Sequence, residues 1–224
     1  MKVTLVSLTQ PLIKGPVDRN LSPEEFIVYC ARVSNPKNQL NTDTAPKLIK
    51  YCLEHSHVSI FEQVSMGVEI VTSRAIAQQI IRHRSFSFQE FSQRYSSVVE
   101  AEPVHLRMQA KSNRQSSTVE VVDLEALQIA TESIERSFED YEKLLAKGVA
   151  RETARFVLPL CAQTTLYMHG TVRSWLTFLN VRLDPHTQAE HRDIAVEIAN
   201  IMVEHFPVIT DSLDTYGKYQ GGFL

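Results

Sequence analysis

The sequence predicts a mixed α/β fold, with one main domain and a helical appendage. The chain has 224 residues, about one and a half times the commonest domain length. Two stretches rich in β-branched residues predict strands, and several longer stretches with apolar residues three or four positions apart predict helices. With 43% apolar residues, the composition is that of a globular protein that can bury a proper core.

The N-terminal part predicts a strand followed by two helices. Residues 2–8 alternate loosely between β-branched and polar side chains, which favours a strand. Ser22 followed by Pro23 is typical of a helix start, so a helix is expected to run to about Val33. A second helix is expected over residues 45–54.

The middle of the chain predicts a second strand and a third helix. Residues 66–72 favour a strand, after which Ser73 can cap a helix whose apolar positions extend to Ile81. Residues 85–97 are rich in Ser, Phe and Gln without a clear period, so a loop or a short irregular helix is expected there. Loops of this kind often contain functional residues.

The C-terminal half is predicted to be helical. Asp123 caps the clearest helix of the chain, which Gly148 ends. Further helices are expected over residues 151–161, over residues 173–181, and in a long segment that begins after Asp184-Pro185.

Charge and cysteine content exclude several classes of protein. The chain has 23 Lys and Arg residues against 26 Asp and Glu residues, a formal net charge of −3, which argues against a basic nucleic-acid-binding module. Its three cysteines show no C-x-x-C spacing and indicate reduced thiols. No apolar stretch approaches the ~18 residues of a membrane span. We therefore expect a cytoplasmic protein that binds neither membrane nor nucleic acid.

Glycine is scarce. The chain has seven glycines, and none lies between Gly67 and Gly148. Dinucleotide-binding and phosphate-binding loops need clustered glycines, so that backbone amides can approach phosphate closely. Any bound phosphate is therefore expected to meet side chains instead of a glycine loop.

A short segment of the chain concentrates arginine. Arg74, Arg82, Arg84 and Arg94 together with Glu90 give a local net charge of +3 (four minus one), which leaves −6 for the rest of the chain. Guanidinium groups suit paired hydrogen bonds to phosphate or to the edge of a base. The segment therefore indicates an anion-binding site.

Helical spacing relates three residues of this segment. Gln79, Arg82 and His83 stand at positions i, i+3 and i+4, so they are predicted to share one face of the third helix. Taken alone, the Arg-His-Arg triplet of residues 82–84 is more typical of a solvated basic face.

A longer string decides between these interpretations. Residues 82–95 read Arg-His-Arg-Ser-Phe-Ser-Phe-Gln-Glu-Phe-Ser-Gln-Arg-Tyr, and this string resembles the signature of the flavin-dependent thymidylate synthases. Further blocks resemble those of the family in the same order: residues 31–34, 55–62, 151–160 and 173–186. Only residues 100–122 and the C-terminus match poorly.

The resemblance implies a fold and a reaction. The fold would be α/β (α+β), a sheet flanked by helices with a helical subdomain, formed by residues 1–224 as a single domain. The family converts dUMP to dTMP with a methylene group from methylenetetrahydrofolate and a hydride from reduced FAD, which NADPH regenerates. A homotetramer with shared active sites is implied as well. A redox cofactor agrees with the fact that protein side chains do not transfer hydride.

The resemblance also implies site residues. The FAD site would contain Ser59, Arg82, His83, Arg84, Glu90, Thr171, Arg173, Thr177, His57 and His186. The substrate site would contain Gln79, Arg82, Glu90, Ser92, Gln93, Arg94, Arg155 and Arg182. Arg182 matches the arginine placed against the pyrimidine ring, where a fixed cation stabilises developing negative charge, and is the predicted catalytic residue. Relatives often have Asn where this chain has Thr171 and Thr177.

Cysteine is not expected to take part in the reaction. Thymidylate synthases of the other class attack the uracil ring with a cysteine in a Pro-Cys-His context. Cys161 instead stands in Pro-Leu-Cys-Ala, with no neighbouring cation to lower its pKa.

Two other functions remain open at this stage. Residues 74–95 could form a single-stranded nucleic-acid-binding module in which Phe86, Phe88, Phe91 and Tyr95 stack on bases. A metal-dependent hydrolase could use His55, His57 and Glu62, although this H-x-H spacing is far from a designed tetrahedral set, so no metal is expected.

Overall fold

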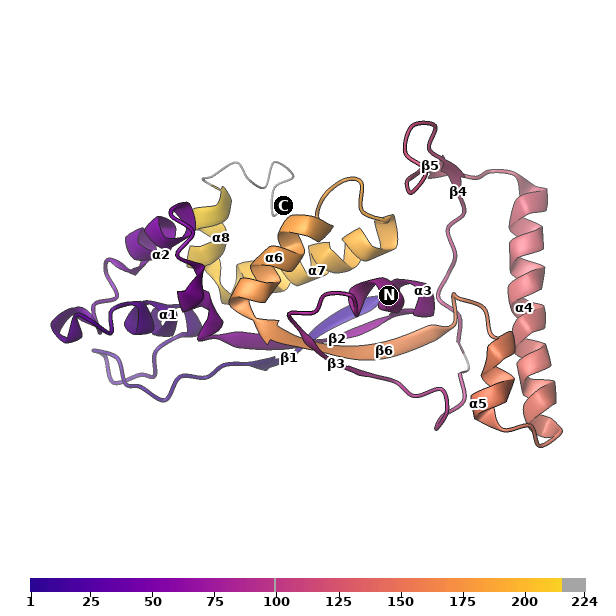
Figure 1. The fold of residues 1–224 in the computed structure, drawn as a ribbon, viewed down its shortest axis with the longest axis horizontal. Helices are drawn as coiled ribbons and strands as arrows, with labels where there is room; N and C mark the ends of the chain where they lie inside the picture. The colour runs from indigo at the N-terminus through magenta and orange to yellow at the C-terminus, as the bar shows by residue number, and fades with distance from the viewer. Residues whose placement is uncertain (99, 215–224) are drawn as a thin grey trace. The chain divides into compact units, whose positions relative to one another are not determined.

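The computed structural model describes residues 1–98 and 100–214 of the chain (Figure 1). The strands are β1 (Lys2–Leu8), β2 (Ser65–Ser73), β3 (Ser87–Glu90), β4 (Arg107–Gln109), β5 (Ser117–Glu120) and β6 (Gln163–Thr171). The helices are α1 (Pro23–Ala31), α2 (Ala45–Glu54), α3 (Arg74–Ile80), α4 (Leu124–Ala146), α5 (Arg151–Ala154), α6 (Val172–Arg182), α7 (Ala189–His205) and α8 (Pro207–Asp214). Three 3₁₀ turns are η1 (Pro36–Asn38), η2 (Val58–Glu62) and η3 (Arg155–Val157).

The chain divides into two compact units. The first unit comprises residues 1–2, 70–82 and 89–166, and the second comprises residues 3–69, 83–88 and those from 167 onward. The sheet has the strand order β1-β2-β6-β3, and the chain passes from one unit to the other within each of these strands. The predicted α/β class is confirmed, since helices and a sheet are both present.

The first unit is built on the long helix α4. Its N-cap is Asp123, whose Oδ1 accepts a hydrogen bond of 3.0 Å from the backbone amide of Glu125. Helix α5 and the turn η3 pack against α4, where Tyr141 is buried (Figure 1). Strands β4 and β5 form a separate antiparallel hairpin.

A buried carboxylate joins β2 to α3 in the same unit. Glu102 accepts 2.7 Å and 3.3 Å hydrogen bonds from the backbone amide of Ser73 and the hydroxyl of Thr72. Ser73 is the N-cap of α3, but its own side chain makes no capping bond. Glu102 therefore satisfies a backbone donor at this helix start, which would otherwise lack a partner.

The second unit has an aromatic core. Helices α6 and α7 lie over the strands (Figure 1), and Trp175 of α6 is fully buried, with its indole NH donating to the carbonyl of Met66 at 3.2 Å. Phe86 meets the Trp175 ring edge-on at 4.6 Å. A Cβ at Gly170 would lie 2.5 Å from the Phe86 ring, so only glycine allows this ring its place.

Several local start and stop signals are confirmed. Ser22 and Glu25 form the capping box of α1, with Pro23 in the first turn. Helix α2 covers residues 45–54 as expected, and Gly148 has φ +81° where α4 has ended. Within the described residues, no helix combines the length and apolar character that crossing a bilayer requires.

Other predictions of secondary structure are wrong. Residues 87–90 form a strand where a loop or irregular helix was expected. The helix expected over residues 151–161 ends after one turn plus η3, because Leu158 precedes a proline and is extended. Helix α7 begins only at Ala189, because Asp184 forms a turn in which its Oδ1 accepts from the His186 amide at 2.7 Å. Strand β6 was not predicted at all.

The third helix is also shorter than expected. Helix α3 ends at Ile80, and Arg82 and His83 lie in the turn that follows. The prediction that Gln79, Arg82 and His83 share one helical face is therefore wrong.

Candidate active site

The predicted site residues divide between the two units. The first unit contains the residues predicted for the substrate, apart from Arg182: Gln79, Arg82, Glu90, Ser92, Gln93, Arg94 and Arg155. The second unit contains Arg182 and the residues predicted for FAD, apart from Arg82 and Glu90: His57, Ser59, His83, Arg84, Thr171, Arg173, Thr177 and His186. Each unit is described in turn.

In the first unit, Glu90 is held by two neighbours. Arg74 Nη1 donates to Glu90 Oε1 at 2.6 Å, and the hydroxyl of Thr164 donates to the same oxygen at 3.0 Å. These contacts tie the end of β3 to the start of α3 and to β6. Arg74 thus serves as the counter-ion of Glu90, a role that its place in the arginine-rich segment did not indicate.

A cavity of about 450 Å³ lies in the first unit. Its lining includes two predicted substrate residues, Ser92 and Arg94, and also Tyr95, Ala150, Arg151 and Glu152. Arg94 Nη2 lies 3.3 Å from Glu152 Oε2, and both side chains are more than half exposed. The cavity therefore offers two guanidinium groups, one of which is paired with an exposed acid.

Arg151 lines this cavity although it was assigned no binding role. Its Nε donates to the hydroxyl of Ser97 at 3.2 Å. Arg155, which was assigned to the substrate, does not line it. The Arg155 Nε donates to the carbonyl of Glu152 at 3.2 Å, and its guanidinium carbon lies 5.9 Å from the centroid of the Phe156 ring. In the sequence, Arg151 lies four positions before Arg155. This spacing does not indicate which of the two arginines lines the cavity.

Gln93 stands apart from the exposed residues around it. It is buried, and among the described residues its Nε2 amide has no hydrogen-bond partner. A buried donor without an acceptor costs about 1–3 kcal/mol. An acceptor atom on a ligand would relieve this cost.

Arg82 and Arg84 present exposed cations. Both side chains are exposed, and neither pairs with another residue in the part of the chain that the structure describes. Gln79 lies half-buried on α3. Within the described residues, the arginine-rich segment therefore keeps unpaired positive charge at Arg82 and Arg84.

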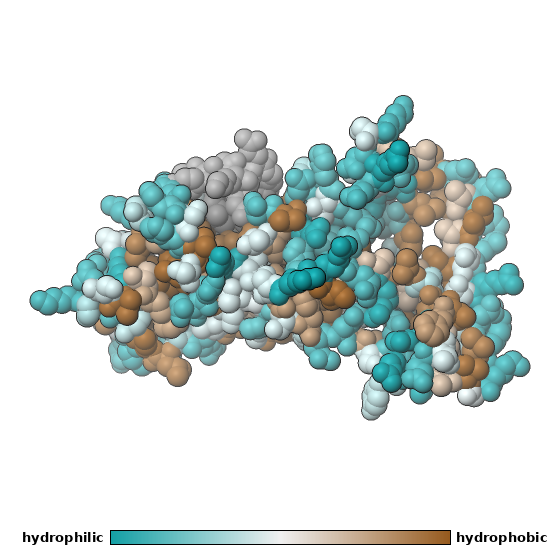
Figure 2. Space-filling model, viewed as in Figure 1, coloured by the Kyte–Doolittle hydropathy of each residue, from teal (hydrophilic) through white to brown (hydrophobic). Residues whose placement is uncertain are grey.

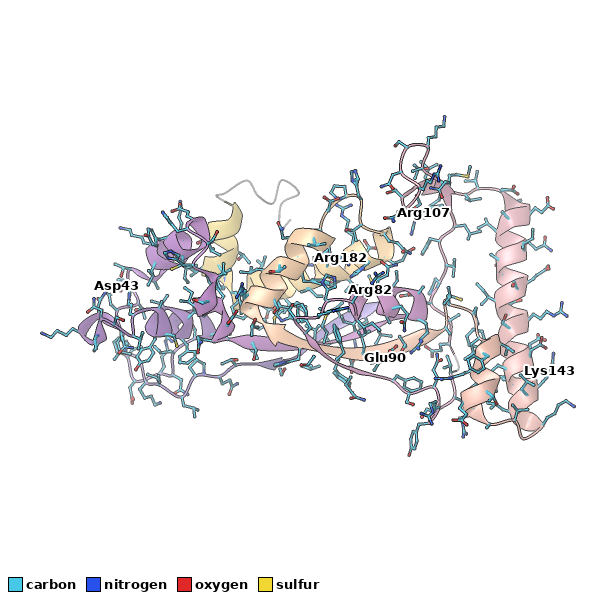
Figure 3. All side chains as sticks on the ribbon, viewed as in Figure 1. Asp43, Arg82, Glu90, Arg107, Lys143 and Arg182 are labelled. Carbon is cyan, nitrogen blue, oxygen red and sulfur yellow. The ribbon has the colours of Figure 1, made fainter. Side chains whose placement is uncertain are left out.

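In the second unit, Arg182 contacts His83. Arg182 projects from the last turn of α6 (Figure 3), and its Nε donates to His83 Nε2 at 2.8 Å. Burial, followed by the positive charge of Arg182, lowers the pKa of His83 to about 4. The imidazole of His83 is therefore neutral near pH 7, as an acceptor of this bond must be.

The remaining predicted FAD residues of the second unit lie mostly on its surface. The hydroxyl of Thr171 caps α6 by accepting from the Ser174 amide, and the hydroxyl of Thr177 donates to the carbonyl of Arg173 at 3.1 Å. Arg173 forms an ion pair with Glu62 of η2. The side chains of Ser59, His57 and His186 are exposed.

The histidines near η2 form no metal centre. The His55 ring stacks on Tyr51 at 4.0 Å, and His57 meets the same ring at 5.8 Å. Glu62 is engaged by Arg173. Within residues 1–98 and 100–214, no group of three or more His, Cys, Asp or Glu side chains could hold a metal ion.

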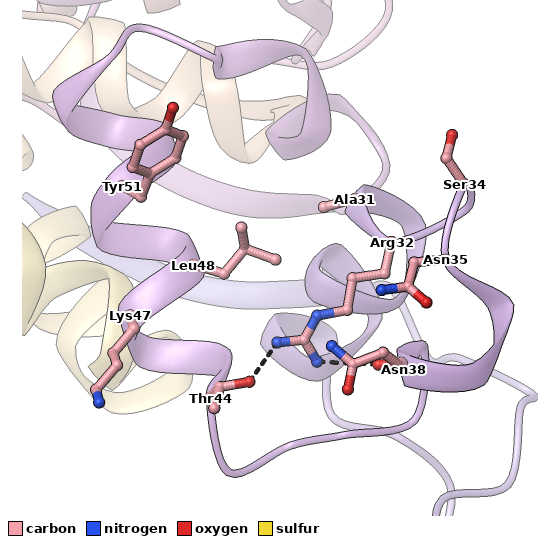
Figure 4. A pocket seen from close by; sticks show the side chains of 9 residues that line it. All are labelled: Ala31, Arg32, Ser34, Asn35, Asn38, Thr44, Lys47, Leu48 and Tyr51. Carbon is pink, nitrogen blue, oxygen red and sulfur yellow. Dashed lines mark hydrogen bonds between the residues drawn. The ribbon is translucent and has the colours of Figure 1, made fainter.

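A second cavity, of about 480 Å³, lies beside α1 and α2 (Figure 4). It is lined in part by Ala31, Arg32 and Ser34, which belong to one of the sequence blocks described above. The Arg32 guanidinium donates to the hydroxyl of Thr44 at 2.6 Å and to the carbonyl of Asn38 at 3.2 Å. This arginine therefore serves to fix the loop before α2.

The chain is similar to several known proteins. Residues 17–208 match the family model described as "Thymidylate synthase complementing protein". A flavin-dependent thymidylate synthase from Synechocystis sp. is 48% identical over 219 residues, which cover 96% of this chain and 100% of that protein. A protein of Paramecium bursaria Chlorella virus 1, named "Probable flavin-dependent thymidylate synthase", is 47% identical over 218 residues, which cover 96% of this chain and 99% of the viral protein.

A solved structure is similar as well. The UMP/dUMP methylase PolB from Streptomyces cacaoi, bound with 5-Br dUMP, superposes with a TM-score of 0.82. It is 27% identical, and the match covers 97% of this chain and 96% of that one. On these grounds, the chain belongs to the family of flavin-dependent thymidylate synthases.

Proposed function

We propose that this chain is a flavin-dependent thymidylate synthase. In the balanced reaction, dUMP, methylenetetrahydrofolate, NADPH and a proton give dTMP, tetrahydrofolate and NADP⁺. The proposal rests on the position of the Arg182 guanidinium, whose Nε donates to Nε2 of the neutral His83 at 2.8 Å. A fixed cation of this kind can stabilise negative charge on a pyrimidine ring as C5 becomes nucleophilic.

The residues present fit FAD. The pyrophosphate of FAD is anionic, and the exposed guanidinium groups of Arg82 and Arg84 have no partner among the described residues. Charge-assisted hydrogen bonds from such groups can replace a glycine loop. We assign FAD to Arg82, His83 and Arg84 together with Ser59, Arg173 and the other cofactor residues of the sequence prediction. When bound, FAD supplies the hydride.

The substrate phosphate is assigned to the first unit. Ser92 and Arg94 line the 450 Å³ cavity, and the unpaired Gln93 amide can donate to a substrate oxygen. Arg155 and Gln79 complete the proposed set. Here Arg94 and Ser92 bind and orient the nucleotide.

No cysteine of the chain is suited to attack the uracil ring. Burial raises the pKa of Cys30, of Cys52 and of Cys161, and the negative charge of Glu102 raises that of Cys161 further. A thiol with a raised pKa is a poor nucleophile at neutral pH. This supports a route through the flavin rather than a protein thiolate.

We further propose a cytoplasmic homotetramer with shared active sites. Three free cysteines suit a reducing compartment. In the first unit, α4 shows apolar side chains along one side and polar ones along the other (Figure 2). In the same unit, Leu124 of α4, Phe156 of η3 and Leu160 are each more than 70% exposed. Large exposed apolar side chains favour association with another subunit.

The nucleic-acid alternative lacks support from the structure. Phe86 packs against Trp175 in the core of the second unit, so it cannot stack on a base. The similar proteins are named thymidylate synthases and a UMP/dUMP methylase.

A spectrum and an activity assay test the proposal. The purified protein should show a flavin absorption band and should oxidise NADPH faster when dUMP and methylenetetrahydrofolate are present. Arg182→Gln should lower kcat by about 100-fold or more, since it removes charge stabilisation at the ring. Arg136→Gln, on the exposed side of α4, is the matched control. A colourless protein that neither binds FAD nor forms dTMP contradicts the proposal.

A further inference from the structure

We infer that His83 is a positioning residue for Arg182: its unprotonated Nε2 accepts the Arg182 Nε–H and so fixes the direction of the guanidinium. This inference rests on the proposed function for its catalytic meaning. It adds to the role implied by sequence, in which His83 only contacts FAD. The contact itself is formed by two side chains of this chain.

The donor and acceptor of this bond can be assigned from the chemistry of the two groups. A guanidinium group has only donors, so the 2.8 Å contact requires a lone pair on His83 Nε2. The proton of the neutral imidazole must then be on Nδ1. The bond uses Nε of Arg182 and not one of its terminal NH₂ groups.

The surroundings of His83 maintain this state. The His83 ring meets Phe178 edge-on at 4.9 Å, Phe86 at 6.4 Å and the buried His191 of α7 at 6.2 Å. Burial and the charge of Arg182 lower the pKa of His191 to about 3, so it adds no second cation. The neighbouring charge that shifts the pKa of His83 is thus that of Arg182 of α6, and the ring of His191 of α7 beside it is neutral near pH 7. A protonated His83 would lose the bond and would repel Arg182.

Two substitutions at His83 test whether this residue must accept a hydrogen bond or only fills space. In His83→Gln, the amide carbonyl reaches the position of the imidazole Nε2, whereas the shorter side chain of His83→Asn reaches only that of Nδ1. We expect His83→Asn to lower kcat about 10- to 100-fold with a smaller change in the KM for dUMP, because a misplaced catalytic group is costly. His83→Gln should retain kcat within about fivefold. His205→Asn, in the last turn of α7, is the control and should behave as the unaltered enzyme.

A double-mutant cycle tests whether His83 acts through Arg182. In an Arg182→Lys background, the Nε donor is absent, so His83→Asn should change kcat less than about twofold. Flavin content is read from the absorption spectrum of each variant, and kcat is compared per bound flavin, so that a loss of FAD is not counted as a loss of positioning. Equal losses for the Gln and Asn substitutions, or an undiminished Asn effect in the Arg182→Lys background, would overturn the inference.

A measurement without flavin or substrate decides the contact independently. In protein labelled with ¹⁵N-histidine, the His83 resonances should show an unprotonated Nε2 and a protonated Nδ1 from about pH 5.5 to 8. Arg182→Ala should raise the pKa of His83, because it removes a neighbouring positive charge. A protonated Nε2 in the unaltered protein refutes the inference even if the enzyme is active. Absence of dTMP formation would instead refute the proposed function and leave this result standing.

Discussion

Two glutamates that pair with arginines, Glu90 and Glu152, have different roles. Glu90 is half-buried and bonded to both Arg74 and Thr164, so it is part of the framework of the first unit. Glu152 is exposed and meets Arg94 across the cavity at 3.3 Å. An exposed ion pair of this kind contributes only about 0.2–1 kcal/mol. A phosphate dianion can therefore displace Glu152 from Arg94 at little cost.

Replacing Glu152 with Gln should strengthen substrate binding. The change frees Arg94 and removes a negative charge near the expected phosphate, so the KM for dUMP should fall about two- to fivefold, in line with the energy of such a pair. Steady-state kinetics at low salt measure the effect. Glu139→Gln breaks an equally exposed contact with Lys143 on α4 and should leave KM unchanged. A KM that stays the same or rises in Glu152→Gln is the contrary result.

Some of the elements depend on contacts that sequence patterns do not reveal. The caps at Ser22 and Asp123 were predictable because the groups involved are two or three residues apart. Helix α3 was extended too far because His83 contacts Phe178 and Arg182, about a hundred positions along the chain. Local propensity cannot anticipate such partners. Strand β6 was missed although its buried positions alternate, because Gly170 weakens the strand signal.

Helix α8 depends on a side chain from another helix. Glu24 of α1 is buried and accepts hydrogen bonds from the backbone amides of Val208 at 3.2 Å and Ile209 at 2.7 Å. Burial, together with the charges of Asp211 and Glu25, raises the pKa of Glu24 to about 7. The carboxyl group therefore satisfies two amides of the first turn of α8 but resists ionisation.

The stability of the protein should reflect this pKa. Since the pKa of Glu24 is higher in the folded state than the ordinary 4.5, the folded state binds the proton more tightly. The contribution of Glu24 is full below about pH 4.5 and is lost as pH rises through about 7, by up to about 3 kcal/mol. Thermal unfolding followed by circular dichroism should show Tm falling between pH 5.5 and 8 more steeply in the unaltered protein than in Glu24→Gln. Glu197→Gln, on the exposed side of α7, should keep the original slope. Identical slopes in all three proteins would show that Glu24 does not titrate in this range.

At the scale of the whole molecule, the predictions depended on different kinds of information. The absence of glycine loops and the arginine-rich segment indicated a site built from side chains, and the motif of residues 82–95 indicated which reaction. The contacts between residues inside the site could not be predicted from the sequence to the same extent. The pairing of Arg74 with Glu90 and the place of Arg151 in the cavity both join segments distant in sequence, so spacing could not reveal them. The roles of the individual site residues remain predictions.

Mixing two inactive variants tests whether subunits share their sites. Arg82 belongs to the first unit and Arg182 to the second, so each variant chain keeps one unit unaltered. When Arg82→Ala and Arg182→Ala chains exchange subunits, some assembled sites should contain neither substitution, and part of the dTMP-forming activity should return. Subunit exchange is verified by mass spectrometry of differently tagged chains. If activity stays absent after complete exchange, each site is formed within one chain.

The scarcity of glycine in this chain has an evolutionary consequence. A phosphate held by the backbone amides of a glycine loop is difficult to adjust in small steps, because every residue type except proline supplies the same amide and only glycine allows the close approach. Where guanidinium, hydroxyl and amide side chains hold the nucleotides, one amino-acid substitution changes one contact. Selection can then adjust nucleotide affinity in small independent steps, and two lineages can retain one chemistry while differing in which contacts they keep.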